Sequence, residues 1–211
     1  MRLVLLAALL MLESCALGPA PREAMSVYDL GPPRAYTRSE PRIAPSILVQ
    51  DVGTPLWLDS TAMVYRLEYR DAGRQYVYAN NRWASSPGAL LAQKLRNRLA
   101  AASDGGIVAP RDNARADYAL RVDLDDFSQV FDSAEKSGGV VVVRATLVDA
   151  ARRTLAGQKA FTIEKAANGP DAQAGVKALG AATEELVDAI TAWVASTLGS
   201  AAKKAPSAAS K

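Results

Sequence analysis

The chain of 211 residues contains no histidine and only one cysteine. Without histidine it lacks the usual general base near neutral pH, the activator of a catalytic serine and the commonest metal ligand. With one cysteine, no disulfide can form within a monomer, so packing must stabilise the fold. These absences disfavour an enzyme, and we expect no catalytic residue, no cofactor and no metal site.

Long apolar runs are missing as well, since no stretch approaches the ~20 apolar residues that a membrane-spanning helix needs. At the N-terminus, the positive charge of Arg2 is followed by residues without polar side chains from Leu3 to Met11. A positive end, a short apolar core and small residues after it are typical of a secretory signal. We therefore expect an exported protein.

The residues LESC at 12–15 resemble the lipobox of bacterial lipoproteins, with the charged Glu13 as a departure from it. That resemblance implies cleavage before Cys15 and lipid attachment to this cysteine, which would anchor the chain without a spanning helix. Lipoproteins that stay in the inner membrane commonly carry aspartate next, where this chain has Ala16. The resemblance therefore implies the outer membrane, facing the periplasm. The alternative is a free cysteine that remains in a signal peptide by chance.

The formal net charge of +3 arises from scattered charges, which gives no indication of nucleic acid binding. A hydrophobic content of 49% is enough to build the core of one domain. More than half of the eleven prolines lie within residues 16–46. We therefore expect a signal peptide at 1–14, a tether at 15–46 with a short strand at 27–30, a folded domain at 47–199 and a disordered tail at 200–211.

Alternation of apolar and polar residues predicts β-strands in both halves of the domain. The expected strands are 47–52, 62–70, 75–79, 117–131, 139–149 and 153–164. A turn at 71–73 joins the second and third of them as a hairpin.

Two segments instead follow the helical period. Ser86 and Pro87 form a helix-start signal, and leucines recur every four residues after it, which predicts a helix over 87–102. A second helix is expected over 170–198, ended by Gly199. The expected core positions on these helices are Leu91, Leu95, Leu186 and Ile190. Strands, helix, strands and helix in this order predict an α+β fold, with a mostly antiparallel sheet and two main helices packed on one face.

Three carboxylates, Asp123, Asp125 and Asp126, lie close together in the sequence and could in principle hold Ca²⁺. Strand alternation instead places Asp123 and Asp125 in solvent, and we favour this solvated strand face. The pair at 138–139, Gly-Gly, carries no phosphate-binding pattern around it, and a turn explains it.

Aromatic residues mark the candidate partner surface. One part of this surface is a loop after Pro55, and the other part precedes the first helix. Both parts are candidates because tryptophan and arginine are enriched at interface hot spots. The candidate residues are Trp57, Leu58, Asp59, Arg82 and Trp83. The alternative is that both tryptophans fill the gap between sheet and helix.

Four segments together resemble the ABC-type transport auxiliary lipoproteins, typified by paraquat-inducible protein C. They are VYDLG (27–31), VGTPLWLDSTAMVYRLEYRD (52–71), YVYANNRWASSP (76–87) and LRVDLDDFSQVFD (120–132). The resemblance implies an outer-membrane lipoprotein that works with an MCE-domain protein and an inner-membrane ABC transporter to move lipids between the membranes. It implies no catalytic residue and no cofactor. Two alternatives stay open, a periplasmic lipid-carrying module with its own apolar pocket and a cell-envelope hydrolase, as does a homo-oligomer.

Overall fold

A three-stranded antiparallel meander forms the centre of the sheet. In the computed structural model, which describes residues 24–32, 36 and 42–204, the meander consists of β6 (Tyr118–Phe131), β7 (Ser137–Asp149) and β8 (Thr154–Ala166). β6 pairs with β7 along its whole length, and β7 pairs with β8 in the same way. The three long strands predicted from alternation are confirmed. Cys15, the predicted signal peptide and the residues from 205 onward lie outside the described residues.

The other edge of β6 is shared by two short strands. β2 (Ile47–Val49) pairs in parallel with its beginning, and β3 (Ala62–Leu67) pairs in parallel with its end. Between them, Gly53 forms a bridge to Asp123. The connection 50–61 therefore runs along the middle of this edge.

Three further strands complete an eight-stranded, mostly antiparallel sheet. β4 (Asp71–Trp83) pairs antiparallel with β3, β1 (Ser26–Tyr28) lies parallel to β4, and β5 (Ile107–Val108) lies parallel to β2. The predicted hairpin is confirmed, but its turn lies at 68–70 instead of 71–73, and β4 continues well beyond residue 79. A short 3₁₀ helix, η1 (Pro110–Asp112), follows β5.

The domain boundary predicted at residue 47 is too late. Leu30 and Ile43, both placed in the tether by the sequence, are buried in the hydrophobic core. The expected strand at 27–30 is present as β1, shifted to Ser26–Tyr28. High proline content therefore does not mark a solvated segment here, because single apolar side chains between the prolines are enough to hold parts of it against the domain.

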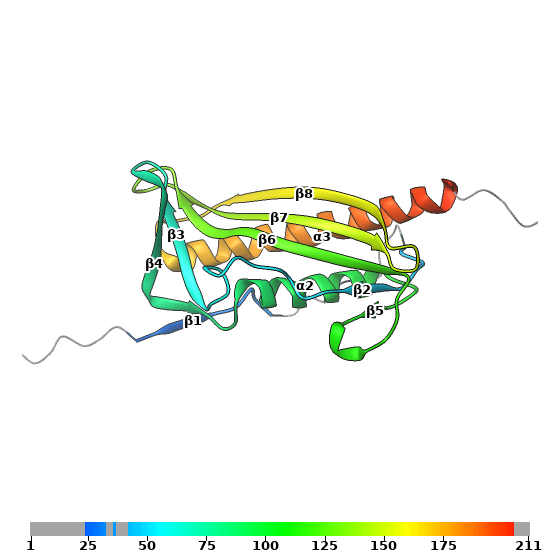
Figure 1. Cartoon of the computed structure of the whole chain (residues 1–211). Helices are drawn as coiled ribbons and strands as arrows, with labels where there is room; N and C mark the ends of the chain where they lie inside the picture. The colour runs from blue at the N-terminus through cyan, green and yellow to red at the C-terminus, as the bar shows by residue number, and fades with distance from the viewer. Residues whose placement is uncertain (1–23, 33–35, 37–41, 205–211) are drawn as a thin grey trace, which may run out of the picture.

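Both helices cover one face of the sheet, as predicted (Figure 1). α2 (Pro87–Ala102) has the predicted bounds. α3 (Ala172–Lys204) begins where the Asp171 carboxylate accepts a hydrogen bond of 2.7 Å from the Ala174 amide, as a helix cap does. It continues past Gly199, so the predicted end there is wrong. A glycine within a helix costs only about 1 kcal/mol relative to alanine, and the alanines and lysines that follow favour the helix.

The core lies between the sheet and the helix pair. The four predicted positions Leu91, Leu95, Leu186 and Ile190 are all fully buried there. Gly139, expected in a turn, lies within β7 directly beneath α3. A Cβ atom at this position would lie 2.5 Å from the Leu179 amide nitrogen. The glycine therefore allows the helix to approach the sheet more closely than any side chain would.

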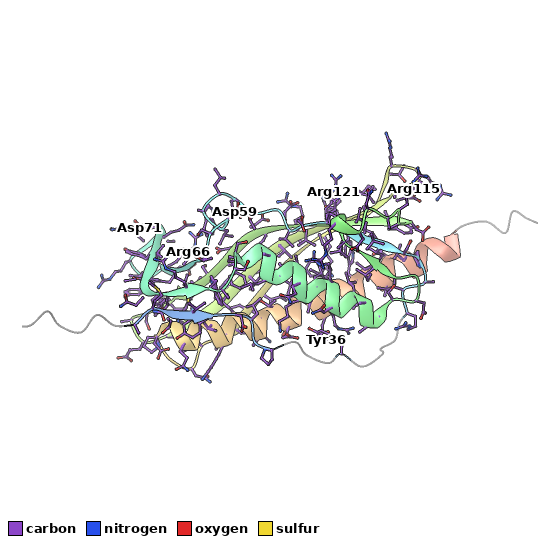
Figure 2. The ribbon with its side chains drawn as sticks, turned by 90° about the horizontal axis from the view of Figure 1, so that it is seen from below. Tyr36, Asp59, Arg66, Asp71, Arg115 and Arg121 are labelled. Atoms are coloured by element: carbon purple, nitrogen blue, oxygen red, sulfur yellow. The ribbon has the colours of Figure 1, made fainter. Side chains whose placement is uncertain are left out.

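Ion pairs join the two helices on the side away from the sheet. Lys94 Nζ lies 2.7 Å from Glu184 Oε1, and Arg98 pairs with Asp188. Tyr36 lies across this junction, and its hydroxyl donates to Glu184 Oε2 at 2.9 Å (Figure 2). The guanidinium carbon of Arg98 in α2 lies 5.4 Å from the centre of the Tyr36 ring, so Tyr36 contacts both helices.

Candidate partner-binding surface

The loop 53–61 holds the first three predicted surface residues. Its start is fixed to β6, because the Gly53 amide donates to the Val122 carbonyl at 2.9 Å and the Leu124 amide donates to the Gly53 carbonyl at 2.8 Å. A single tight turn then follows, in which the amides of Leu58 and Asp59 both donate to the Pro55 carbonyl. The loop is therefore an ordered projection from the edge of the sheet.

That turn decides which side chains reach solvent. Leu58 is 1% exposed and belongs to the core, so it is not part of an open surface as expected. Trp57 is half-buried against the core, and Asp59 is exposed. Leu56, which is not among the predicted surface residues, is 92% exposed. A turn closed from residue 55 to residue 58 directs Leu58 back toward its base, and this pattern could have identified Leu56 as the outward residue.

Beneath the loop, Trp57 rests on a charged pair. The guanidinium carbon of Arg66 lies 5.4 Å from the centre of the Trp57 ring, and Arg66 Nη2 lies 3.3 Å from Asp126 Oδ2. The pairing of β6 with β7 shifts register between Leu124 and Asp126. Regular alternation would place Leu124 and Phe127 on opposite faces of the strand, because they are three residues apart, but both are buried. The bulge thus sets the position of the carboxylate that holds Arg66 under the indole ring.

Trp83 and Arg82 lie at the end of β4, and the structure separates their roles. Trp83 is 2% exposed and packs edge-to-face on Phe127, with ring centres 5.4 Å apart. It fills the core, so its assignment to an open surface is wrong. Arg82 is exposed and pairs in register with Ala62, the residue that follows the loop. Trp57, Asp59 and Arg82 therefore remain as surface candidates, with Leu56 added.

A groove of about 500 Å³ adjoins the loop. It is lined by Gly53, Thr54, Pro55, Trp57, Asp123, Leu124, Asp125 and Arg144. Asp123 and Asp125 are exposed as predicted, and Asp125 lies 3.6 Å from Arg144. Within the described residues, no group of three or more histidines, cysteines, aspartates or glutamates is placed to hold a metal ion. The loop is thus an apolar projection beside a groove with charges of both signs.

Residues 28–191 match the family model described as ABC-type transport auxiliary lipoprotein component. The chain belongs to this family. The resemblance seen in the sequence motifs is thereby confirmed, and the match begins within β1, which agrees with the early start of the fold. As a member of the ABC-type transport auxiliary lipoproteins, the chain is a lipoprotein component associated with ABC-type transport.

Solved structures show the same fold. Protein XCC0632 from Xanthomonas campestris is 16% identical, with a TM-score of 0.73, and the match covers 85% of this chain and 100% of that one. An uncharacterized protein is 20% identical, with a TM-score of 0.63, and the match covers 82% of this chain and 99% of that one. No curated protein sequence matches this family member.

The described part of this lipoprotein contains no helix that is both long and apolar enough to cross a membrane. α3 has 33 residues, but charged and small residues occupy its side away from the core, so only one face of the helix is apolar.

Proposed function

We propose that this lipoprotein is an accessory subunit of an ABC-type intermembrane lipid transport system that supports envelope integrity. It is anchored in the outer membrane through lipid on Cys15, faces the periplasm and contacts an MCE-domain protein, which acts with an inner-membrane ABC transporter. The match of residues 28–191 to the auxiliary lipoprotein family is the observation that carries this proposal.

The loop around Leu56 is the surface that contacts the MCE-domain protein in this proposal. The Leu56 side chain is 92% exposed and so contributes almost no packing to the free domain. In a complex the same side chain would bury its apolar area, which is favourable. Trp57 supports the loop from below, and Asp59, Asp123 and Asp125 provide a polar rim. An apolar anchor within a polar rim is the usual anatomy of a protein interface.

Affinity purification from detergent-solubilised envelopes tests the proposal. The tagged wild-type chain should co-purify with an MCE-domain protein and with the transporter subunits, as identified by mass spectrometry. Leu56→Asp should lower the recovery of these partners at least about tenfold, because interface anchors commonly contribute 2 kcal/mol or more. Val77→Asp, at an exposed apolar residue of β4, is the matched control and should keep them. Absence of any MCE-domain protein from the wild-type sample would contradict the proposal.

One observation favours the lipid-carrier alternative as a second candidate. A hollow of about 660 Å³ lies between β1 and α3, and its lining includes Val27, Leu30 and Val176. A Cβ atom on Gly180, in the same lining, would meet nothing within 4 Å, so Gly180→Leu should extend into the hollow. If the chain itself carries lipid, this variant should lose the lipid that co-purifies with the wild type. Gly199→Leu on the same helix is the matched control.

A further inference from the structure

Positive charge is concentrated at one end of the elongated molecule. This basic end consists of segments 109–121, 149–155 and 199–204, which hold seven basic and three acidic side chains, a net charge of +4. The whole chain has a net charge of +3, so the remainder is slightly negative. Pairing of Tyr118 with Asp149 and a hydrogen bond of 2.9 Å from the Ala150 amide to the Asp117 carbonyl bring the first two segments together. The last turns of α3 extend beyond the same end (Figure 1).

The carboxylates of the basic end accept hydrogen bonds from neighbouring groups of the domain. Asp117 Oδ2 accepts hydrogen bonds from the Ser46 amide at 2.8 Å and from the Ser46 hydroxyl at 2.7 Å. Asp149 accepts from the amide and from Nη1 of Arg152, both at 2.8 Å. Asp112 accepts from the Ala109 amide at 2.7 Å. These carboxylates cap turns and hold loops, and of the three only Asp149 pairs with a cation of the basic end, Arg152.

Most of the arginines at this end have no acidic partner. All five are exposed, and within the described residues only Arg152 forms an ion pair; the other four are Arg111, Arg115, Arg121 and Arg153. Leu155 follows the Arg152–Arg153 turn and is 63% exposed. Unpaired cations beside an exposed apolar side chain are the combination that binds the surface of an anionic bilayer.

The basic end lies far from the predicted lipid anchor. β1 is at the opposite end of the molecule, where Figure 2 also shows Asp71, while Arg115 and Arg121 lie at the basic end. Ten residues separate Cys15 from Ser26, a reach of at most about 35 Å. The 33 residues of α3 alone span roughly 50 Å. With its anchored end at one membrane, the domain can therefore hold its cations well away from that surface.

We propose that the basic end binds the anionic surface of a second bilayer, so that the domain bridges two membranes. The exposed arginines come from separate elements, namely η1, the connection after it, β6 and the turn between β7 and β8. This spread suits a lipid surface of dispersed phosphates better than a single acidic peptide. This inference deepens the proposed function and rests on its lipid anchor at Cys15.

A vesicle-bridging assay tests it with the full lipidated protein. The protein is inserted into neutral phosphatidylcholine vesicles, which are then mixed with fluorescent vesicles that contain phosphatidylglycerol, and the captured fluorescence is measured after flotation. We expect capture of the anionic vesicles, little capture of neutral ones, and loss of capture as salt shortens the Debye length from about 10 Å at 0.1 M to about 3 Å at 1 M.

Charge reversal locates the contact. The triple variant Arg111→Glu, Arg115→Glu, Arg153→Glu should lower capture by at least roughly tenfold, since each cation near an anionic surface contributes to binding. The matched control is Arg70→Glu, Arg74→Glu, Lys136→Glu, which makes the same charge change at exposed cations of the other end and should capture normally. Thermal unfolding of both variants checks that each is folded.

The outcomes separate the two proposals. If the protein does not float with the phosphatidylcholine vesicles, the lipid anchor of the proposed function fails. If it is anchored but captures no anionic vesicles, or captures them equally after reversal of Arg111, Arg115 and Arg153, the bridging inference is overturned. It is also overturned if that variant bridges vesicles normally but loses a protein partner from solubilised envelopes, since the basic end would then dock a protein.

Discussion

Trp57 lies over the guanidinium group of Arg66, with 5.4 Å between the guanidinium carbon and the ring centre. Arg66 is in turn paired with Asp126 at the bulge of β6. The stack makes Trp57 the support of the loop and leaves Leu56 as its outward side chain. The two neighbours should therefore respond differently to substitution.

Trp57→Ala should lower the free energy of unfolding by roughly 1–3 kcal/mol, because it removes half-buried aromatic area and the cation–π contact. Leu56→Ala should change it by less than about 0.5 kcal/mol, as exposed positions do. Urea unfolding measures both, and co-purification with the proposed MCE-domain partner is scored in parallel. Equal losses of stability in the two variants would show that the loop is not built as described.

Leu95→Ala should cost roughly 2–5 kcal/mol, because the side chain is fully buried between α2 and the sheet and its loss leaves a cavity. Leu155→Ala, at a leucine that is 63% exposed, is the matched control and should cost little. Chemical denaturation of both variants gives the comparison. A change at residue 95 below about 0.5 kcal/mol would mean that this face of α2 is not core.

Gly139→Ala should be destabilising by roughly 1–3 kcal/mol, because the new methyl group would meet the backbone of α3 at Leu179 and Ala178 and push the helix from the sheet. Gly199→Ala should instead stabilise by up to about 1 kcal/mol, since this helical glycine has open space around its Cβ position. The melting temperatures of the two variants test this prediction. An unchanged melting temperature for Gly139→Ala would show that α3 does not need to approach β7 so closely.

Hydrogen bonds from Ser46 hold the pKa of Asp117 below its usual value. A carboxylate with a lowered folded-state pKa stabilises the fold above its unfolded-state pKa, and this contribution is lost as the pH falls through the folded-state value. Between pH 5 and about pH 2, the stability of the wild type should therefore fall more steeply than that of Asp117→Asn, which has no carboxylate to protonate at this position. Melting temperatures across this range test it; parallel pH curves for the two proteins would rule out the contribution.

Cys15→Ser should release the protein from its membrane, which we propose is the outer membrane, because lipid on this residue is its predicted anchor. Fractionation of the envelope, with immunoblotting of membrane and soluble periplasmic fractions, measures the shift. A matched Ser14→Ala change leaves the cysteine in place and should stay in the membrane fraction. Flotation of Cys15→Ser with outer membrane would contradict the anchor.

Local signals in the sequence were enough to predict α2 and the long strands. Ser86 and Pro87 mark the start of α2, and the regular alternation of 118–124 reveals β6 because each signal lies within a few residues. The shared edge of β6 could not be predicted, since it depends on which distant segment pairs there. The bulge after Leu124 and the buried Leu30 and Ile43 also break the local pattern. For the same reason the predicted surface included the buried Leu58 and missed the exposed Leu56, because the turn at Pro55 decides which side chain faces outward.

The shared edge of β6 also constrains when the domain can form during export. Ile47 needs Tyr118 and Tyr65 needs Gln129 as backbone partners, and β6 in turn needs β7. During the proposed export, a chain that emerges N-terminus first thus presents β2, and the edge of β3 that does not face β4, with unpaired backbone until β6 has emerged. Pairing between such distant segments is slow, so these strand edges should stay open to pairing with other chains during this interval.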